Sequence, residues 1–112
     1  MSLQENIRTT LRGVVATLAT SQAVLEYARD VPGVPVIAEL YCQWFDDVYH
    51  PDSAEFRHAF SPEALVALEE LNRRLDAVGD AVEGLAVVDV IVAPWWKPVQ
   101  AAAQRALTSL QP

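Results

Sequence analysis

The sequence predicts an all-α protein: a single compact antiparallel helical bundle of four to five helices with short Pro- and Gly-containing connections. Apolar side chains recur at spacings of three and four along most of the chain, which is the period of a helix with one buried face. Several of these stretches begin with Ser, Asp or Pro in positions typical of helix starts. The 112 residues contain no internal repeat and no low-complexity linker, so we expect 1–112 to be one helical domain.

The first helix is expected to begin at Ser2, because Ser2 and Glu5 fit a capping box in which the two side chains satisfy free backbone N–H groups. An apolar seam with alternating spacings of four and three follows and ends at the "DVPGVP" turn. It consists of Ile7, Leu11, Val14, Leu18, Ser21 and Leu25. Since Ser21 is polar and can bond backbone groups, the sequence leaves open whether the helix continues through Ser21 or breaks into two.

A second helix is predicted from about Pro35 to His50, because Pro35 suits a first helical turn and Pro51 stops the helix. At 100° per residue its apolar and aromatic side chains fall on one side, and we expect them to face the core. These are Ile37, Leu40, Tyr41, Trp44, Phe45 and Val48. The opposite side, expected to face water, carries Glu39, Cys42, Asp46 and His50.

Two further helix starts follow. "DSAE" (Asp52 to Glu55) has the form of a second capping box and predicts a short helix that carries Phe56 and Phe60. "SPEA" places Ser61 as the cap of a longer helix with a leucine stripe, and Gly79 is the expected terminator.

The stretch Leu85–Ala93 gives conflicting signals, because its β-branched residues favour a strand among helical neighbours. The sequence is compatible with either a short buried helix or an extended segment here. A last helix is predicted from Pro94 or Pro98 to about Leu110. Since Trp95 and Trp96 are consecutive, they cannot share one narrow stripe; either one ring, with Trp96 as the candidate, is exposed, or both rings cover the end of the bundle.

The net charge of −7 disfavours nucleic acid, whose backbone is bound by clustered Lys and Arg. Acidic residues gather between Asp30 and Glu55, a stretch without Lys or Arg, which predicts a negative field able to attract a basic partner. No apolar run approaches the ~20 residues that span a bilayer, so no membrane association is expected. A poor secretion signal and a lone cysteine, Cys42, favour a cytoplasmic location.

The stretch "YCQWFDDVYHPD" concentrates the groups that could carry chemistry. Spacings of four place Cys42, Asp46 and His50 along one line of a helix, and Glu55 with His58 has an i, i+3 spacing found in di-iron bundles. The alternative function is therefore a bundle that binds a metal ion or small ligand through Glu39, Cys42, Asp46, His50, Glu55 and His58. Two histidines and one cysteine supply few ligands, and no oxyanion-hole or nucleophile motif accompanies Cys42, so we expect no catalytic, cofactor or metal site.

The favoured prediction is a non-enzymatic protein-interaction domain with an acidic surface. Its partner would be a basic protein, or a second copy joined along the first helix as a homodimer. In size and charge the chain is similar to small acidic immunity or antitoxin-type proteins that neutralise basic toxins. The expected interaction surface consists of Glu39, Asp46, Asp47, Tyr49, His50, Asp52 and Trp96.

Overall fold

The helical periodicity of the sequence produces helices throughout the computed structural model, which describes residues 2–110 and has no strand among them. The α-helices are α1 (Leu3–Leu18), α2 (Ser21–Asp30), α3 (Val36–Cys42), α4 (Ala54–His58), α5 (Pro62–Ala77), α6 (Gly79–Val82), α7 (Val87–Ile91) and α8 (Lys97–Ser109). A π-helical turn, η1 (Gln43–Val48), continues α3, and a 3₁₀ turn, η2 (Pro94–Trp96), leads into α8.

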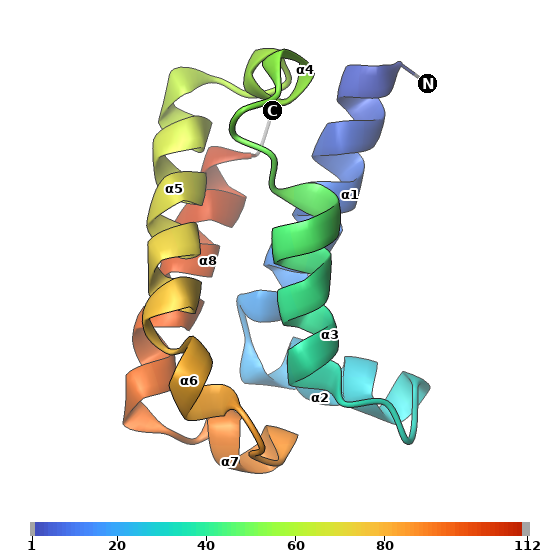
Figure 1. Ribbon diagram of the computed structural model, residues 1–112, viewed down its shortest axis with the longest axis vertical. Helices are drawn as coiled ribbons and strands as arrows, with labels where there is room; N and C mark the ends of the chain where they lie inside the picture. Colours follow the sequence, from blue (N-terminus) through green and yellow to red (C-terminus); the bar gives the residue numbers. More distant parts are fainter. Residues whose placement is uncertain (1, 111–112) are drawn as a thin grey trace.

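Of the three longest helices, α5 and α8 lie side by side on the left of Figure 1, and α1 lies on the right. Helix α8 packs between α5 and α1, and the α3–η1 segment lies across from α5 in Figure 1. The all-α class is confirmed. Eight α-helices lie within residues 2–110, more than the four to five predicted, because the chain breaks after α1 and also forms the short helices α4, α6 and α7.

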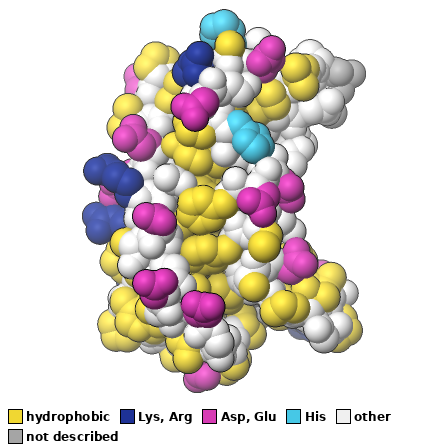
Figure 2. Space-filling view, in the orientation of Figure 1, with side chains coloured by type: hydrophobic (Ala, Val, Ile, Leu, Met, Phe, Trp, Pro, Cys, Tyr) yellow, Lys and Arg dark blue, Asp and Glu magenta, His cyan; other side chains and the backbone are white. Residues whose placement is uncertain are grey.

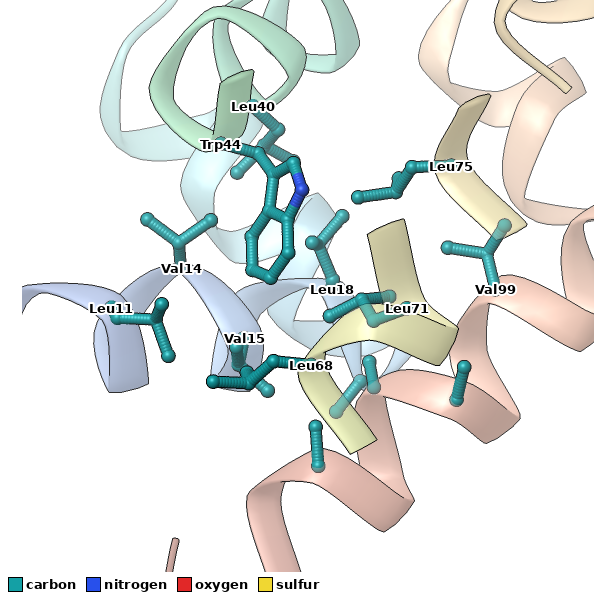
Figure 3. Close-up of a cluster of buried hydrophobic side chains, with 14 of the residues drawn as sticks. Leu11, Val14, Val15, Leu18, Leu40, Trp44, Leu68, Leu71, Leu75 and Val99 are labelled. Atoms are coloured by element: carbon teal, nitrogen blue, oxygen red, sulfur yellow. The ribbon is translucent and has the colours of Figure 1, made fainter. Parts of the chain in front are cut away.

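The buried apolar side chains form one continuous core, to which α1, α3–η1, α5 and α8 contribute most. At its centre the Trp44 ring, which is 0% exposed, points from η1 into the space between α1 and α5 (Figure 3). Its indole Nε1 donates a hydrogen bond to Asn72 Oδ1 at 3.0 Å. A buried N–H group is therefore satisfied, and the same contact ties η1 to α5.

Serine side chains cap the helices as their positions in the sequence predict. Ser2 Oγ accepts from the Glu5 N–H at 3.1 Å, and Ser61 Oγ accepts from the Ala64 N–H at 3.1 Å. At α4 the predicted start is wrong by one residue. The Ser53 N–H donates to the His50 carbonyl and closes a turn over Pro51 and Asp52, so Ser53 rather than Asp52 caps the helix.

Removing the Ser61 cap is expected to lower stability measurably. Ser61→Ala leaves an N-terminal N–H of α5 without its acceptor, and we expect a loss of about 1 kcal/mol in the free energy of unfolding. Urea unfolding followed by circular dichroism measures it. Ser61→Asp supplies another acceptor and should retain most of the stability; an equal loss in both variants would show that the cap is not the cause.

The chain breaks near Ser21, so the two-helix alternative holds. Helix α1 ends at Leu18, and Thr20 caps α2 by accepting from the Ala23 N–H at 3.0 Å. The apolar seam of α1 packs into the chain's own core, where Leu11 and Leu18 are fully buried. A dimer joined along this seam would need surface that the core already covers.

Two predictions near the C-terminal half are corrected. Gly79 does not terminate α5; it is the first residue of α6, and a Cβ there would lie 3.8 Å from the Tyr41 ring. Leu85–Ala93 contains the short helix α7, so the helical alternative holds over part of the stretch. Only Val90 in it is fully buried, so it is not the buried helix that was expected. Gly84 makes the turn before α7 with a φ of +78°, a conformation that other residues rarely adopt.

Candidate functional site

The second predicted helix changes its winding halfway. It is α-helical to Cys42 and then π-helical, with the Tyr49 N–H donating to the Trp44 carbonyl five residues back at 3.0 Å. His50 lies beyond the last turn, with its Nε2 3.0 Å from the Asp47 carbonyl oxygen. The row of Cys42, Asp46 and His50 along one helical line is therefore not formed, because that row requires α-helical winding to His50.

The polar residues of this segment lie where the sequence predicts. Glu39, Cys42, Asp46 and His50 are exposed, as are Asp47 and Asp52. One aromatic residue of the predicted core side differs from expectation in burial. Phe45 was expected in the core and is 39% exposed, whereas Trp44 and Val48 of the same π turn are buried as predicted.

Trp96, which was predicted on the interaction surface, is buried. Its side chain is 0% exposed, because η2 turns it into the core at the start of α8, while Trp95 beside it remains partly exposed. Tyr49, also predicted on the surface, is only partly exposed and stacks on Trp44 with ring centroids 4.8 Å apart. Of the two tryptophans, Trp95 is thus the one that reaches solvent.

The candidate ligands of the metal alternative do not converge. Over residues 2–110 no three His, Cys, Asp or Glu side chains form a group that could hold a metal ion. Glu55 and His58 are both exposed on α4, and the Glu55 carboxylate accepts from the Ser53 hydroxyl at 3.1 Å. Its own backbone N–H and the Ser53 hydroxyl lower the pKa of Glu55, so local hydrogen bonds hold this carboxylate.

Aromatic rings fill the space between α3–η1 and α5. The Tyr41 hydroxyl donates to the Leu75 carbonyl at 2.7 Å, and the Tyr41 and Phe45 rings stack with centroids 5.9 Å apart. Figure 2 shows the result as a strip of hydrophobic side chains down the middle of this face, with acidic side chains on both sides. The rings are fixed by contacts to α5 and the core, while Phe45 remains open to water.

Carboxylates of α5 and of the turn after η1 lie near these rings. Partial burial raises the pKa of Tyr41, and the nearby Asp76 carboxylate raises it further. Partial burial likewise raises the pKa of Tyr49, with further contributions from Glu69 and Asp52. We call the three rings Tyr41, Phe45 and Tyr49, together with the carboxylates Asp52, Glu69 and Asp76, the acidic seam.

The arginines of α5 are paired with Glu70. Glu70 accepts from Arg73 at 2.6 Å and Arg74 at 2.9 Å, and Arg105 of α8 lies 3.7 Å away. The hydrogen bond from Arg74, with the neighbouring arginine charges, lowers the pKa of Glu70. Glu70 thus lies near Arg105 of α8, while Arg73, four residues after Glu69 and three before Asp76, shares their face of α5 and has its guanidinium bonded to Glu70.

The sequence holds a signal for the α5 side of the seam that the sequence analysis missed. Glu69 and Asp76 are seven residues apart, which places them on one face of α5 about 10 Å from each other. Moreover, neither residues 30–56 nor residues 75–96 contain a Lys or Arg. These two segments are distant in sequence, and only the fold brings them to the same face of the molecule.

The partly buried hydroxyl of Tyr41 predicts a sensitivity to alkali. Because its pKa is raised in the folded protein, the unfolded chain loses this proton first, from about pH 10 upward. The stabilisation is complete below about pH 10 and is lost as the pH rises toward the folded-state pKa. Urea unfolding at pH 8 to 11 should show a steeper decline in the wild type than in Tyr41→Phe, and equal declines would contradict the assignment.

No known protein family, curated protein or solved structure matches this chain. None of the helices between residues 2 and 110 combines the length and apolar character needed to cross a bilayer. The functional argument therefore depends on the geometry and charge of the acidic seam.

Proposed function

We propose that this chain is a non-enzymatic protein-interaction domain that binds a basic protein partner through the acidic seam. The observation that supports it is the arrangement itself: aromatic rings lie between carboxylates of α5 and of the turn after η1, and the segments 30–56 and 75–96, which hold the rings, Asp52 and Asp76, carry no Lys or Arg. A surface of this kind matches a partner that offers cationic and apolar side chains together.

The two parts of the seam would make different contributions to binding. The carboxylates of Asp52, Glu69 and Asp76 create a negative potential that speeds the encounter with a cationic partner. The rings supply apolar contact area, which is where most of the binding energy of an interface is found. Because Tyr41 is held by its bond to Leu75 and Tyr49 by stacking on Trp44, little side-chain entropy is lost on binding.

This assignment favours a role like that of small acidic immunity or antitoxin-type proteins, which neutralise a basic protein by covering part of it. In such a role the domain needs no catalytic group, and its single exposed thiol, Cys42, fits the reducing cytoplasm. Glu39, Asp46, Asp47 and His50 would lie at the rim of the interface, where charged residues change the rate of association more than the affinity.

Capture with paired baits tests the proposal. The wild type and the variant Asp52→Asn/Glu69→Gln/Asp76→Asn are immobilised and exposed to proteins of the source cell, and bound proteins are identified by mass spectrometry. We expect the wild type to retain a protein of net positive charge, released by raising the salt concentration. The seam variant should lose it, because its carboxylates no longer attract the partner.

A charge-matched control separates the seam from general acidity. Glu26→Gln/Asp30→Asn/Asp89→Asn removes three exposed carboxylates that lie outside the seam. It should retain the same partner as the wild type. If both triple variants lose the partner equally, or if the specifically bound protein is acidic, the proposed function is wrong.

A further inference from the structure

An apolar groove of about 690 Å³ continues the acidic seam at the end of the molecule where α6 and α7 lie. One wall is α3 and the loop before it, and the other is the stretch from α6 to the start of α7. Tyr41 belongs to both the seam and the groove, so the two surfaces are continuous. The groove falls within the range of volumes that proteins use to bury a ligand or an anchoring side chain.

The lining of the groove is mainly apolar and partly open to water. It includes Ile37, Ala38, Tyr41, Val82, Leu85 and Val87. At its rim Val34 is 38% exposed and Leu85 is 44% exposed, so large apolar side chains face solvent in the free protein. The Tyr41 hydroxyl is already bonded to Leu75, and the groove therefore offers an apolar occupant more contact area than hydrogen bonds.

Both walls carry negative charge and no positive charge. Glu83 lines the groove, Asp76 and Asp80 precede it along the same wall, and Glu39 lies on the opposite helix beside Ala38. The segments 30–56 and 75–96, which supply nearly all of the lining, contain no Lys or Arg. An occupant that joins an apolar side chain to flanking cations is complementary to this arrangement, while an acidic occupant would be repelled.

We infer that the groove receives an apolar anchor of the same basic partner, so that the partner segment is amphipathic. A leucine-like or aromatic side chain enters between Ile37 and Leu85, and lysine or arginine side chains of the same segment meet the carboxylates of the seam and of α6. This inference rests on the proposed function of the acidic seam and adds what the partner must carry: apolar anchors in register with its positive charges.

Cys42 provides a reporter for occupancy, because it lines the groove, is exposed and is the single cysteine of the chain. Two synthetic helical peptides serve as probes. The leucine peptide has leucine on one face and lysine on the other. The glutamine peptide, which is the control, has the same length and charge, with glutamine in place of leucine. For each, the rate of Cys42 modification by a neutral disulfide reagent and the amide chemical shifts of Glu69 and Asp76 are measured.

The leucine peptide should shift the Glu69 and Asp76 amides and slow the modification of Cys42 about tenfold or more. The glutamine peptide should shift the same amides and leave the modification rate unchanged. If both peptides shift the amides and neither protects Cys42, the groove inference is wrong while the proposed function stands. If neither peptide shifts the amides, the proposed function fails, and the inference fails with it.

A matched pair of substitutions checks that protection comes from the groove. Ala38→Gln places a longer polar side chain at an exposed helical position in the lining and should weaken binding of the leucine peptide about tenfold, without affecting the glutamine peptide. Ala54→Gln, at an exposed helical position on α4 away from the groove, should leave the affinities of both peptides unchanged. Unchanged affinity of the leucine peptide in Ala38→Gln would overturn the inference.

Discussion

Trp44→Ala should lower the free energy of unfolding by about 3–5 kcal/mol, the range found when a large buried aromatic side chain is truncated. The Trp44 ring is 0% exposed and occupies the space between α1 and α5 (Figure 3), so its removal leaves a cavity that rigid helices on either side fill poorly. The substitution also leaves the Asn72 amide without the N–H that it accepts from. For a domain of this size the loss is a large fraction of an ordinary total stability of about 5–15 kcal/mol.

Urea unfolding of the purified variant measures this loss. Trp44→Phe keeps most of the ring but breaks the bond to Asn72, and should fall between the wild type and Trp44→Ala. Phe45→Ala is the matched control, since Phe45 is the next residue of the same π turn and is 39% exposed. A loss at Trp44 no larger than that at Phe45 would contradict the placement of Trp44 at the centre of the core.

Trp96→Ala is expected to have an effect of similar size, about 3–5 kcal/mol. Its side chain is fully buried at the start of α8, although it was included in the expected interaction surface. Its indole Nε1 has no hydrogen-bond acceptor among residues 2–110, in contrast to that of Trp44. Trp96→Phe therefore breaks no hydrogen bond and should be tolerated better than Trp44→Phe, because only packing changes.

Measuring stability and binding on the same variants distinguishes the core position of Trp96 from the surface position that was predicted. We expect Trp96→Phe to bind the captured basic partner as the wild type does. Trp96→Ala should lower the free energy of unfolding rather than act on binding directly. Trp95→Ala, which alters the partly exposed neighbour, should be less destabilising than Trp96→Ala. If Trp96→Ala unfolds like the wild type but loses the partner, Trp96 is a surface residue and the fold assignment at η2 is wrong.

The elements that the sequence predicted well are those set by local chemistry. The caps at Ser2 and Ser61, and the α8 helix after Pro94, depend on residues within one turn of each other. The π turn after Cys42 was not predicted, because nothing in the apolar spacing of so short a stretch marks the change of winding. The exposure of Val88 and Val92 was missed for another reason: β-branched residues indicate burial on average, and only packing decides which of them is covered.

The candidate site was predicted only in part, because one side of it is set by local sequence and the other by the packing of two helices. The acidic residues of the second helix and its exposed thiol lie on the surface as expected, since their position relative to the apolar stripe is a local property. The contribution of Glu69 and Asp76 depends on the approach of α5 to α3–η1, which is seen in the bond between Tyr41 and Leu75. No spacing within either helix predicts that approach.

The central claim is that the acidic seam binds a basic protein, and the association rate of the captured partner as a function of salt concentration tests it most directly. Between low and physiological ionic strength the wild-type rate should fall steeply, because salt screens the carboxylates over a distance of about 8–10 Å. Asp52→Asn/Glu69→Gln/Asp76→Asn should associate more slowly at low salt and show a much shallower dependence. A wild-type rate that does not change with salt, or a seam variant with the same rate and salt dependence as the wild type, would contradict the claim.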